Sequence, residues 1–344
     1  MSFVRFQSDD SVVGLQTLVS PMWSNNITTL TSLYTSSNQE TSNTGKFYTE
    51  VYNGVPDVAG SEVQFAIAYG HISGSSSAPF NSLVSTSTPT RDIYGQFRNL
   101  IYGDENASFN FGGSNGTSRD VFIISVNRAR FKESIKLATL NLKLSSGSTS
   151  IYLTDNSKDS SATNYIGTSR YYYIVSGSNG NSYNGVATQT NSGSYGLLIP
   201  DMGLIVLNPR ALAIPAANGG INLSIDETSP SSYTSPYSIN NRALAAAMIS
   251  SNSASFGLQS SETMSSRYFW VRVKNREFNY TTNPSIIDSN GNILYSTLVD
   301  DPQTYITTIG LYNDSNELLA IAKLSKPLVK DFTKELTVRV KLDF

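Results

Sequence analysis

The sequence has no cysteine, a single histidine and few charged residues. Without cysteine there is no disulfide framework, no thiolate nucleophile and no cysteine-ligated metal site. Charged residues make up 15% of the 344 residues, against about 25% in an average protein. The formal net charge of −2 gives no general attraction to nucleic acid or to an anionic membrane. We therefore expect neither of them among the partners.

Long apolar runs are also missing. No stretch approaches the roughly 18 residues of a transmembrane helix, and the first residues, MSFVRFQSDDS, contain no apolar segment of the kind that a signal peptide needs. The sequence therefore predicts synthesis and assembly in the cytoplasm.

Patterns of catalytic and metal-binding residues are sparse. His71 would need a serine and a carboxylate beside it to act as a triad base, and an ordinary strand-end residue is the simpler interpretation. The segment 112–116 matches G-x-S-x-G, but a strand pattern follows where a nucleophile elbow requires a helix. The segment 288–292 resembles a calcium loop without the distal glutamate, which favours a β-turn. We predict no enzymatic activity, no cofactor and no metal.

What the sequence does contain is polar β-strand chemistry. Serine, threonine, asparagine, glycine and tyrosine dominate, and 11% of residues are aromatic. Apolar and polar residues alternate with the period of a strand in many segments, including 62–69, 140–144, 151–153, 268–273, 305–312 and 318–324. The last two flank Asn313–Asn316, which predicts a hairpin turn, and Ser145–Ser148 between 140–144 and 151–153 predicts another hairpin loop. Val121–Val126 is a dense apolar run of strand length. The pattern favours a mainly β fold, with β-sandwich-like sheets and long polar loops.

Helical patterns are few. Thr90 precedes a segment in which Ile93, Phe97, Leu100 and Ile101 share one helical face, so we expect it to cap a short helix. An alanine-rich segment through Leu244, Ala247 and Met248 predicts a second helix, capped by Ser238. Long Ser/Gly/Asn-rich loops are expected at 70–90, 103–118, 154–163, 176–195 and 225–238. The whole predicts one or two short helices in a β-rich chain.

Three regions are expected: an N-terminal β-rich region with long loops at 1–118, a central β region with a short helix at 119–260, and a C-terminal β region at 261–344. In the alternative division, the last two form one domain. In the last region a strand alternates without a break. Its apolar side chains are Leu336, Val338, Val340, Leu342 and Phe344. We expect this face, including the terminal residue, to be buried under neighbours.

Two further groups are candidates for contacts with other subunits. Trp270 lies on the mixed face of the strand that carries Phe269, opposite its apolar face. Arg128 and Arg130 fall on one face of a segment that we expect to be extended. They are either part of a solvated strand face, or part of a charged edge that prevents wrong strand pairing, or partners of inter-subunit salt bridges. Glu133 follows this basic segment, and the mixed charge argues against nucleic-acid binding.

Several stretches resemble one family when taken together. They are residues 120–133, residues 195–209 and above all the segment 265–344, with YFWVRVKN, EFNYTTNP, YITTIGLYN, LLAIAKLSKP and VRVKLDF. They are similar to virion structural proteins of contractile-tailed, T4-like phages, including those of cyanobacteria. The resemblance covers most of the chain and is weakest in the loops at 70–90 and 176–195.

This resemblance implies a non-enzymatic building block of the virion, most simply in the tail, baseplate or neck, that contacts copies of itself and other virion structural proteins in a symmetric assembly. The resemblance carries no catalytic residues to transfer. Two alternatives remain. The long Tyr/Ser/Asn loops suit a receptor-binding or capsid-decorating module. The other alternative is an enzyme carried on the particle that degrades polysaccharide or peptidoglycan with paired carboxylates, although no such pair stands out in the sequence.

Overall fold

The computed structural model describes residues 4–36, 47–76, 88–158, 163–183, 190–227, 240–249 and 254–344. The chain forms two compact units. Unit 1 consists of residues 1–17 and 263–344, and unit 2 consists of residues 18–262. The division falls inside two long strands, β1 (Ser11–Pro21) and β17 (Gln259–Val273).

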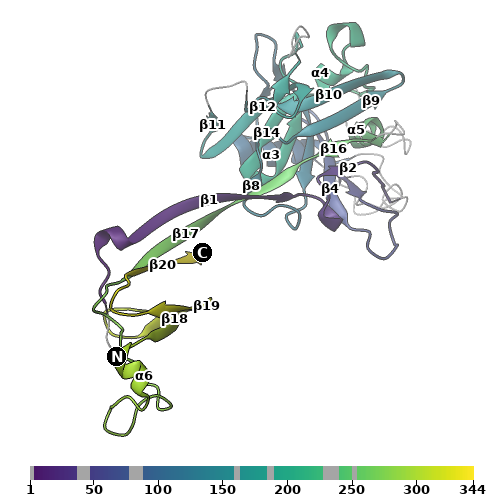
Figure 1. Cartoon of the computed structure of the whole chain (residues 1–344). Coiled ribbons are helices and arrows are strands. Elements are labelled where there is room, and N and C mark those ends of the chain that lie inside the picture. Colours follow the sequence, from purple (N-terminus) through teal and green to yellow (C-terminus); the bar gives the residue numbers. More distant parts are fainter. Residues whose placement is uncertain are drawn as a thin grey trace. The chain divides into compact units, whose positions relative to one another are not determined.

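One large antiparallel sheet forms most of unit 2 (Figure 1). Its strands follow the order β2-β16-β9-β10-β12-β14-β15-β7-β4-β3, with β11 and β13 also paired to β12. Their bounds are β2 Thr29–Leu30, β3 Thr49–Tyr52, β4 Val63–His71, β7 Asp120–Val126, β9 Asn141–Ser146, β10 Thr149–Asp155, β11 Asn164–Ile166, β12 Ser169–Ser178, β13 Asn181–Ser182, β14 Gly196–Ile199, β15 Leu204–Leu207 and β16 Phe256–Gly257. Two shorter pieces complete the strands of this unit, a hairpin of β5 (Phe109–Asn110) with β6 (Thr117–Ser118), and β8 (Ser134–Ile135), which pairs with β17.

The alternation in the sequence explains these strands. In β4 the side chains of Phe65, Ile67 and Tyr69 are buried on one face of the sheet, as the pattern predicts. The predicted hairpin after residue 144 is also present: Ser146 lies opposite Thr149, and the turn between them places Gly147 at φ 60°. That left-handed conformation costs glycine nothing.

The sheet curls back so that strands far apart in the order enclose one core. Phe65 of β4 and Phe256 of β16 meet edge to face with ring centroids 5.1 Å apart, and Trp23 lies 5.0 Å from Phe256. Tyr34, beyond β2, exchanges two backbone hydrogen bonds with Tyr52 of β3. These contacts bring the two ends of the strand order together around the largest apolar cluster of the chain.

Helices are minor elements among the described residues. Four are α-helical, namely α3 Thr90–Tyr102, α4 Pro209–Ala213, α5 Asn240–Ile249 and α6 Ser296–Asp300. Four short 3₁₀ turns are η1 Ser8–Asp10, η2 Ser24–Asn26, η3 Pro200–Met202 and η4 Ala216–Asn218. The prediction of a mainly β fold with few helices is therefore confirmed.

The two predicted helices are α3 and α5. In α5 the side chains of Leu244, Ala247 and Met248 are buried as expected, whereas its proposed cap, Ser238, lies outside the described residues. In α3 the expected face was partly wrong. Leu100 is exposed while Arg98 is buried, because the buried arc of the helix is centred on Tyr94 and Arg98. Thr90 is the first helical residue instead of the cap.

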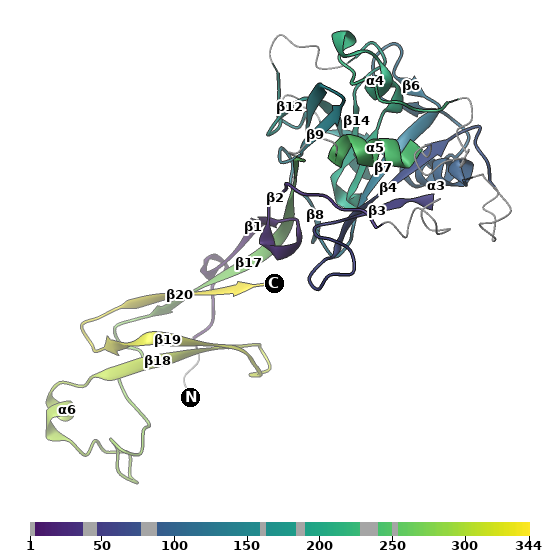
Figure 2. The same ribbon diagram turned by 90° about the vertical axis from the view of Figure 1, so that its right-hand side faces the viewer.

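Unit 1 contains two small sheets (Figure 2). In one, β17 lies between β1 and β20 (Leu336–Asp343). The other is the hairpin of β18 (Thr304–Tyr312) and β19 (Leu318–Lys330). Its turn is the predicted one, with Asn313 donating its backbone N–H to Glu317 and Asn316 in the left-handed conformation at φ 61°.

This division differs from the three predicted regions. The expected boundary at residue 260 lies close to the observed one at 262. No boundary falls near residue 118, because β4 and β7 are neighbours in one sheet, with His71 opposite Asp120 and Phe65 opposite Val126. The first 17 residues join the C-terminal part instead.

Candidate interaction surface

Unit 1 has almost no hydrophobic core of its own. Among its described residues only three apolar side chains are buried, those of Val273, Leu311 and Val340, whereas the described part of unit 2 buries 47. Large apolar side chains are instead exposed on unit 1. Eighteen of its described residues belong to this group: Val4, Phe6, Val12, Val13, Leu15, Trp270, Phe278, Tyr280, Leu294, Tyr295, Val299, Tyr305, Tyr312, Leu318, Leu319, Ile321, Phe332 and Phe344. A folded monomer rarely leaves so much apolar surface in water, so this unit is the candidate interaction surface.

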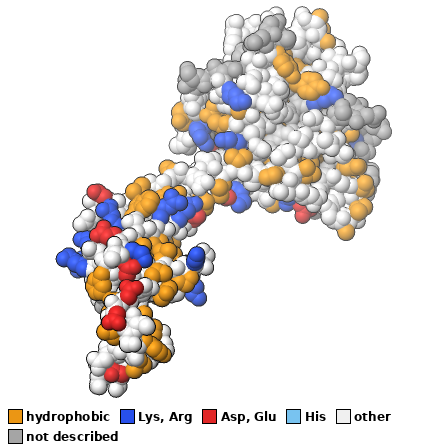
Figure 3. All heavy atoms as spheres, viewed as in Figure 1, with side chains coloured by type: hydrophobic (Ala, Val, Ile, Leu, Met, Phe, Trp, Pro, Cys, Tyr) orange, Lys and Arg blue, Asp and Glu red, His pale blue; other side chains and the backbone are white. Residues whose placement is uncertain are grey.

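Figure 3 shows how the surface is composed. Orange apolar side chains gather over the elements of unit 1, and lysine, arginine, aspartate and glutamate lie between them. Such a mixture of apolar side chains and charges of both signs is typical of protein–protein contacts, in which an apolar centre has a polar rim.

The sheet of β1, β17 and β20 in unit 1 has one apolar face and one mixed face. Residues that lie opposite each other in an antiparallel pair share a face. Phe269 lies opposite Val340 and Val271 opposite Val338, and the ring of Phe6 is 5.5 Å from that of Phe269 on the same face. Most of these side chains are only half-buried, so the face is incompletely covered within the chain.

The mixed face of that sheet carries aromatic and charged residues. Trp270 lies opposite Arg339, whose guanidinium is 5.8 Å from the Trp270 ring and 5.4 Å from the Tyr268 ring. Next to them Arg272 pairs with Asp10 at 2.9 Å. The indole of Trp270 is 37% exposed, and a tryptophan flanked by arginines is a common anchor in interfaces.

The hairpin of β18 and β19 exposes a second apolar face. Ile306, Ile309 and Leu311 of β18 are buried or half-buried, while Tyr305 and Tyr312 point to the other side and are exposed. On β19 the exposed side chains next to the turn are Leu318, Leu319 and Ile321. An isolated two-stranded hairpin is marginally stable in water, so this face is suited to being covered.

The predicted contact residues of β20 are partly covered. Val340 is buried, and Leu336, Val338 and Leu342 are half-buried, in agreement with the alternation in the sequence. Phe344 was expected to be buried, and this expectation is wrong within the chain. Its backbone N–H donates to Ser265 at 2.9 Å, but its side chain is 75% exposed because it lies beyond the last residue of β20 that faces β17.

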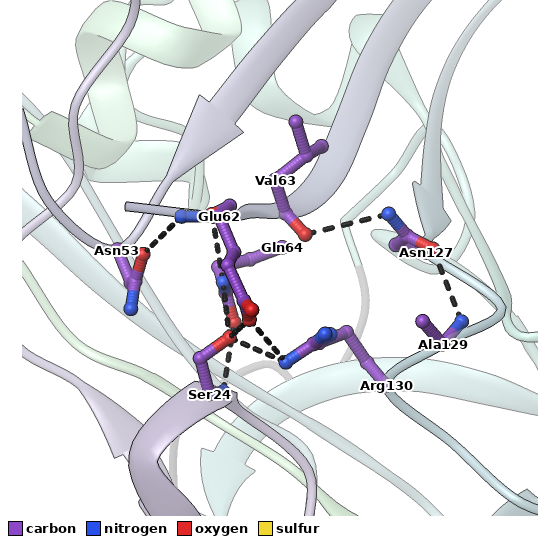
Figure 4. Close-up of polar contacts among 8 residues, drawn as sticks. All are labelled: Ser24, Asn53, Glu62, Val63, Gln64, Asn127, Ala129 and Arg130. Carbon is purple, nitrogen blue, oxygen red and sulfur yellow. Dashed lines mark hydrogen bonds and ion pairs between the residues drawn. The ribbon is translucent and has the colours of Figure 1, made fainter. Parts of the chain in front are cut away.

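Arg130, by contrast, is used inside unit 2 (Figure 4). Its guanidinium lies 2.9 Å from the Glu62 carboxylate and donates to the hydroxyl of Ser24. The same hydroxyl donates to Glu62 at 2.5 Å, and Gln64 donates to it at 2.8 Å. The hydrogen bond from Ser24, together with the charge of Arg130, holds the pKa of Glu62 below its usual value. This arginine joins two loops to β4 within its own unit.

Arg128 borders a hollow beside that cluster. Residues 128–130 form a turn and not the extended segment that we expected, because β7 ends at Val126. The Arg128 guanidinium lies over the Phe131 ring at 4.7 Å and donates to the Phe131 carbonyl. The hollow has a volume of about 340 Å³ and is lined by Glu50, Val63, Phe65, Ala66, Ser125, Val126, Asn127, Arg128, Phe131 and Met202. Arg128 and Arg130 therefore belong to unit 2, whereas the other predicted contact residues belong to unit 1.

The surroundings of His71 bear on the catalytic hypothesis. Ser118 and Asp120 lie near it, since Asp120 is its partner across β4 and β7. However, the Nδ1 atom of His71 accepts a hydrogen bond from the Ser73 backbone at 3.0 Å, and Ser118 donates directly to the Asp120 carboxylate at 2.7 Å. In a triad the histidine would stand between the other two groups. This arrangement is a strand-end hydrogen-bond network.

The possible calcium loop forms a turn. The Oδ1 atom of Asp288 accepts hydrogen bonds from the backbone N–H groups of Asn290 and Asn292, both at 2.8 Å. These hydrogen bonds, led by those from Asn292, hold the pKa of Asp288 below its usual value. Among the described residues no group of three or more histidine, aspartate or glutamate side chains is placed to hold a metal ion.

The apolar exposure of the first strand was missed at the sequence level. Val12, Val13 and Leu15 of β1 are exposed, and the run Ser11–Thr17 contains no charged residue. An uncharged strand with apolar residues on both faces could have signalled an unprotected sheet edge.

Comparisons with family models, with curated proteins and with solved structures find no match for this chain. Within the described part of the chain, no helix is long and apolar enough to cross a membrane.

Proposed function

We propose that the chain is a non-enzymatic structural subunit of a tailed-phage virion, placed in the tail, baseplate or neck and acting through protein–protein contacts in a symmetric assembly. The observation that carries the proposal is the near absence of a core in unit 1, which exposes eighteen large apolar side chains and buries three among its described residues.

The physical argument is one of free energy. Burying a large apolar side chain contributes about 1.5–3 kcal/mol, and a domain is stable only when such gains exceed the lost conformational entropy. Unit 2 collects these gains in its own core. Unit 1 collects few of them within one chain, so a surrounding assembly supplies the rest. This difference between the units is expected of a subunit that folds through unit 2 and is held between neighbouring subunits through unit 1.

The polar clusters of unit 2 are consistent with a structural role. The groups around Arg130 and around Asp120 form ion pairs and hydrogen bonds with one another within the chain. Their hydrogen bonds join strands and loops, and these side chains are committed to neighbours in the fold. We therefore assign these side chains a structural role and not a catalytic one.

The test is the composition of purified particles. Virions purified by density gradient should contain this chain in constant proportion to the main tail protein, as measured by quantitative mass spectrometry. Salt washes should not remove it, because an apolar contact is not screened by salt. Finding the chain only in the soluble fraction of infected cells would overturn the proposal.

A receptor-binding or capsid-decorating module is the second candidate. It is favoured by the exposed tyrosines of unit 2, since four of its nine exposed large apolar or aromatic residues in the described part are Tyr34, Tyr152, Tyr165 and Tyr183. Tyrosine is the typical residue of adaptable binding surfaces. If this candidate is correct, antibodies against unit 2 will block adsorption of intact particles. Adsorption at the normal rate in the presence of antibody bound to unit 2 would exclude it.

A further inference from the structure

The exposed apolar surface of unit 1 is large enough to form a stable interface. Its eighteen exposed large side chains are on average about half exposed. With 150–250 Å² for a whole aromatic side chain, they offer roughly 1,000 Å² or more of apolar surface. A standard protein–protein interface buries about 800 Å² on each partner. Summed over the whole unit, the exposed apolar surface is therefore larger than the area that one partner buries in a standard interface.

The charge of unit 1 permits contact with an identical unit. It contains eleven lysine and arginine residues and eleven aspartate and glutamate residues, so its formal net charge is zero. Two copies of a neutral unit do not repel each other, whereas a large net charge would keep them apart. Unit 2 contains the remaining thirteen basic and fifteen acidic residues.

The two edge strands of the β1–β17–β20 sheet also have backbone groups that are available for pairing. In the described chain β17 separates β1 from β20, so both outer strands have one unpaired side. Edge strands are normally protected by charges or proline, as in β20 with Arg339 and Lys341 and in β19 with Pro327. The part of β1 in unit 1 has no such residue, and Leu15 on it is 76% exposed. A strand of this kind favours pairing with another chain.

We propose that the occupant of this surface is a second copy of the chain, with unit 1 packed against unit 1 through the exposed hairpin face around Leu319 and Ile321 and along the edge of β1. A second copy is present at equal concentration as soon as the chain is made. Its unit 1 has the same zero net charge and the same exposed apolar side chains. This inference deepens the proposed function and rests on it for its biological setting, because it names the partner of the same surface.

The first experiment measures the molar mass of the full-length chain by light scattering and sedimentation at micromolar concentration. The wild-type chain should be an oligomer. Ile321→Asp should weaken self-association by at least about tenfold. The matched control is Val58→Asp in unit 2, because Val58 and Ile321 are both 59% exposed. This control should leave the molar mass of the oligomer unchanged.

A second experiment uses the absence of cysteine. Leu319→Cys introduces the only thiol of the chain, at a side chain that is 68% exposed. A short bifunctional thiol reagent should link two Leu319→Cys chains covalently, and a Val58→Cys chain should stay unlinked. This variant keeps the surface apolar, so it tests the contact even if Ile321→Asp fails to fold. Circular dichroism checks that all variants are folded.

The outcomes separate this inference from the proposed function. A monomeric wild-type chain without a covalent dimer overturns the inference, and if purified particles contain that chain, the proposed function stands with a different partner. Equal self-association of Ile321→Asp and the wild type also overturns it. An oligomer that depends on Ile321 supports the inference even if the particles lack the chain, in which case only the proposed function fails.

Discussion

The ammonium of Lys330 lies 2.6 Å from the side-chain oxygen of Asn279, and the lysine is completely buried. It also donates to the backbone carbonyls of Asn275 and Asp331 at 2.8 and 2.7 Å. Three acceptors therefore use all three donors of the ammonium. In a unit with few buried apolar residues, this polar contact fixes the end of β19 to the segment that follows β17.

Replacing Lys330 with methionine should destabilise unit 1 by about 1–3 kcal/mol, because buried acceptors lose their donor. Urea unfolding, monitored through hydrogen exchange of the amides near residues 275–279, measures the effect. Lys326→Met is the matched control, since Lys326 is exposed on the same strand and should change the stability by no more than about 0.5 kcal/mol. Equal effects of the two variants would contradict the assigned role of Lys330.

Val340 and Phe344 should respond differently to truncation, although they share the alternating face of β20. Val340 is 6% exposed opposite Phe269, whereas Phe344 is 75% exposed. Val340→Ala should lower the stability of unit 1 by about 1.5–3 kcal/mol through lost burial and the cavity left behind. Phe344→Ala should change it by no more than about 0.5 kcal/mol. Hydrogen exchange of the β17 amides measures both, and a larger loss in Phe344→Ala would be inconsistent with the observed exposure.

Local patterns in the sequence were sufficient to predict individual strands and hairpins. The turn at Asn313–Asn316 and the strand at Val121–Val126 follow from side-chain alternation and turn chemistry that act over a few residues. The hairpin around Gly147 was predicted for the same reason. These elements depend on neighbours in the sequence, so a single sequence contains the necessary information.

Contacts between distant residues were not predictable in this way. The pairing of β4 with β7, which places residues 63–71 beside residues 120–126, depends on the packing of the whole sheet. The alternation of β20 predicted a buried face, but not that the side chain of Phe344, one residue past the end of β20, would be exposed. The basic residues at 128 and 130 were assigned to an extended segment, because their alternation does not distinguish a strand from a turn.

The two tryptophans of the chain should report on the two units separately. Trp23 is 2% exposed and its indole donates to the Phe256 carbonyl at 2.9 Å. Trp23→Ala should therefore lower the stability of unit 2 by about 3–5 kcal/mol. Trp270→Ala removes a partly exposed side chain of unit 1 and should leave the unfolding of unit 2 unchanged. Denaturant titration, monitored by circular dichroism and by amide hydrogen exchange in β4, measures both effects. Similar losses of unit 2 stability in both variants would refute the independence of the unit 2 core.

Asp120 should make the stability of unit 2 depend on pH. Its carboxylate is buried and accepts hydrogen bonds from Ser118 at 2.7 Å and from Tyr69 at 3.0 Å. Burial raises the pKa of Asp120 from 3.8 to about 6, although these hydrogen bonds oppose the rise. The folded chain thus binds the proton more tightly than the unfolded chain. The free energy of unfolding should fall as the pH rises from about 4 to about 6, by up to about 3 kcal/mol from this group.

His71, opposite Asp120, contributes a slope of the other sign. Burial, together with the charge of Arg119, lowers the pKa of His71 below 6.5, while the charge of Glu227 opposes this shift. The unfolded chain therefore binds this proton more tightly, and stability is lost as the pH falls below 6.5.

The variant Asp120→Asn separates the two effects, because it removes the titration of the carboxyl group. It also removes one of the two acceptor oxygens that Ser118 and Tyr69 use, but that loss lowers the stability by the same amount at every pH in this range. Relative to the wild type, its free energy of unfolding should increase between pH 4 and pH 7, since the wild type alone bears the cost of a buried charge at neutral pH. His71→Gln, which removes the opposite slope, should show a relative gain in stability toward low pH. Urea midpoints measured across this range test both signs. A difference between Asp120→Asn and the wild type that does not change with pH would mean that the Asp120 carboxyl group titrates alike in the folded and unfolded chain.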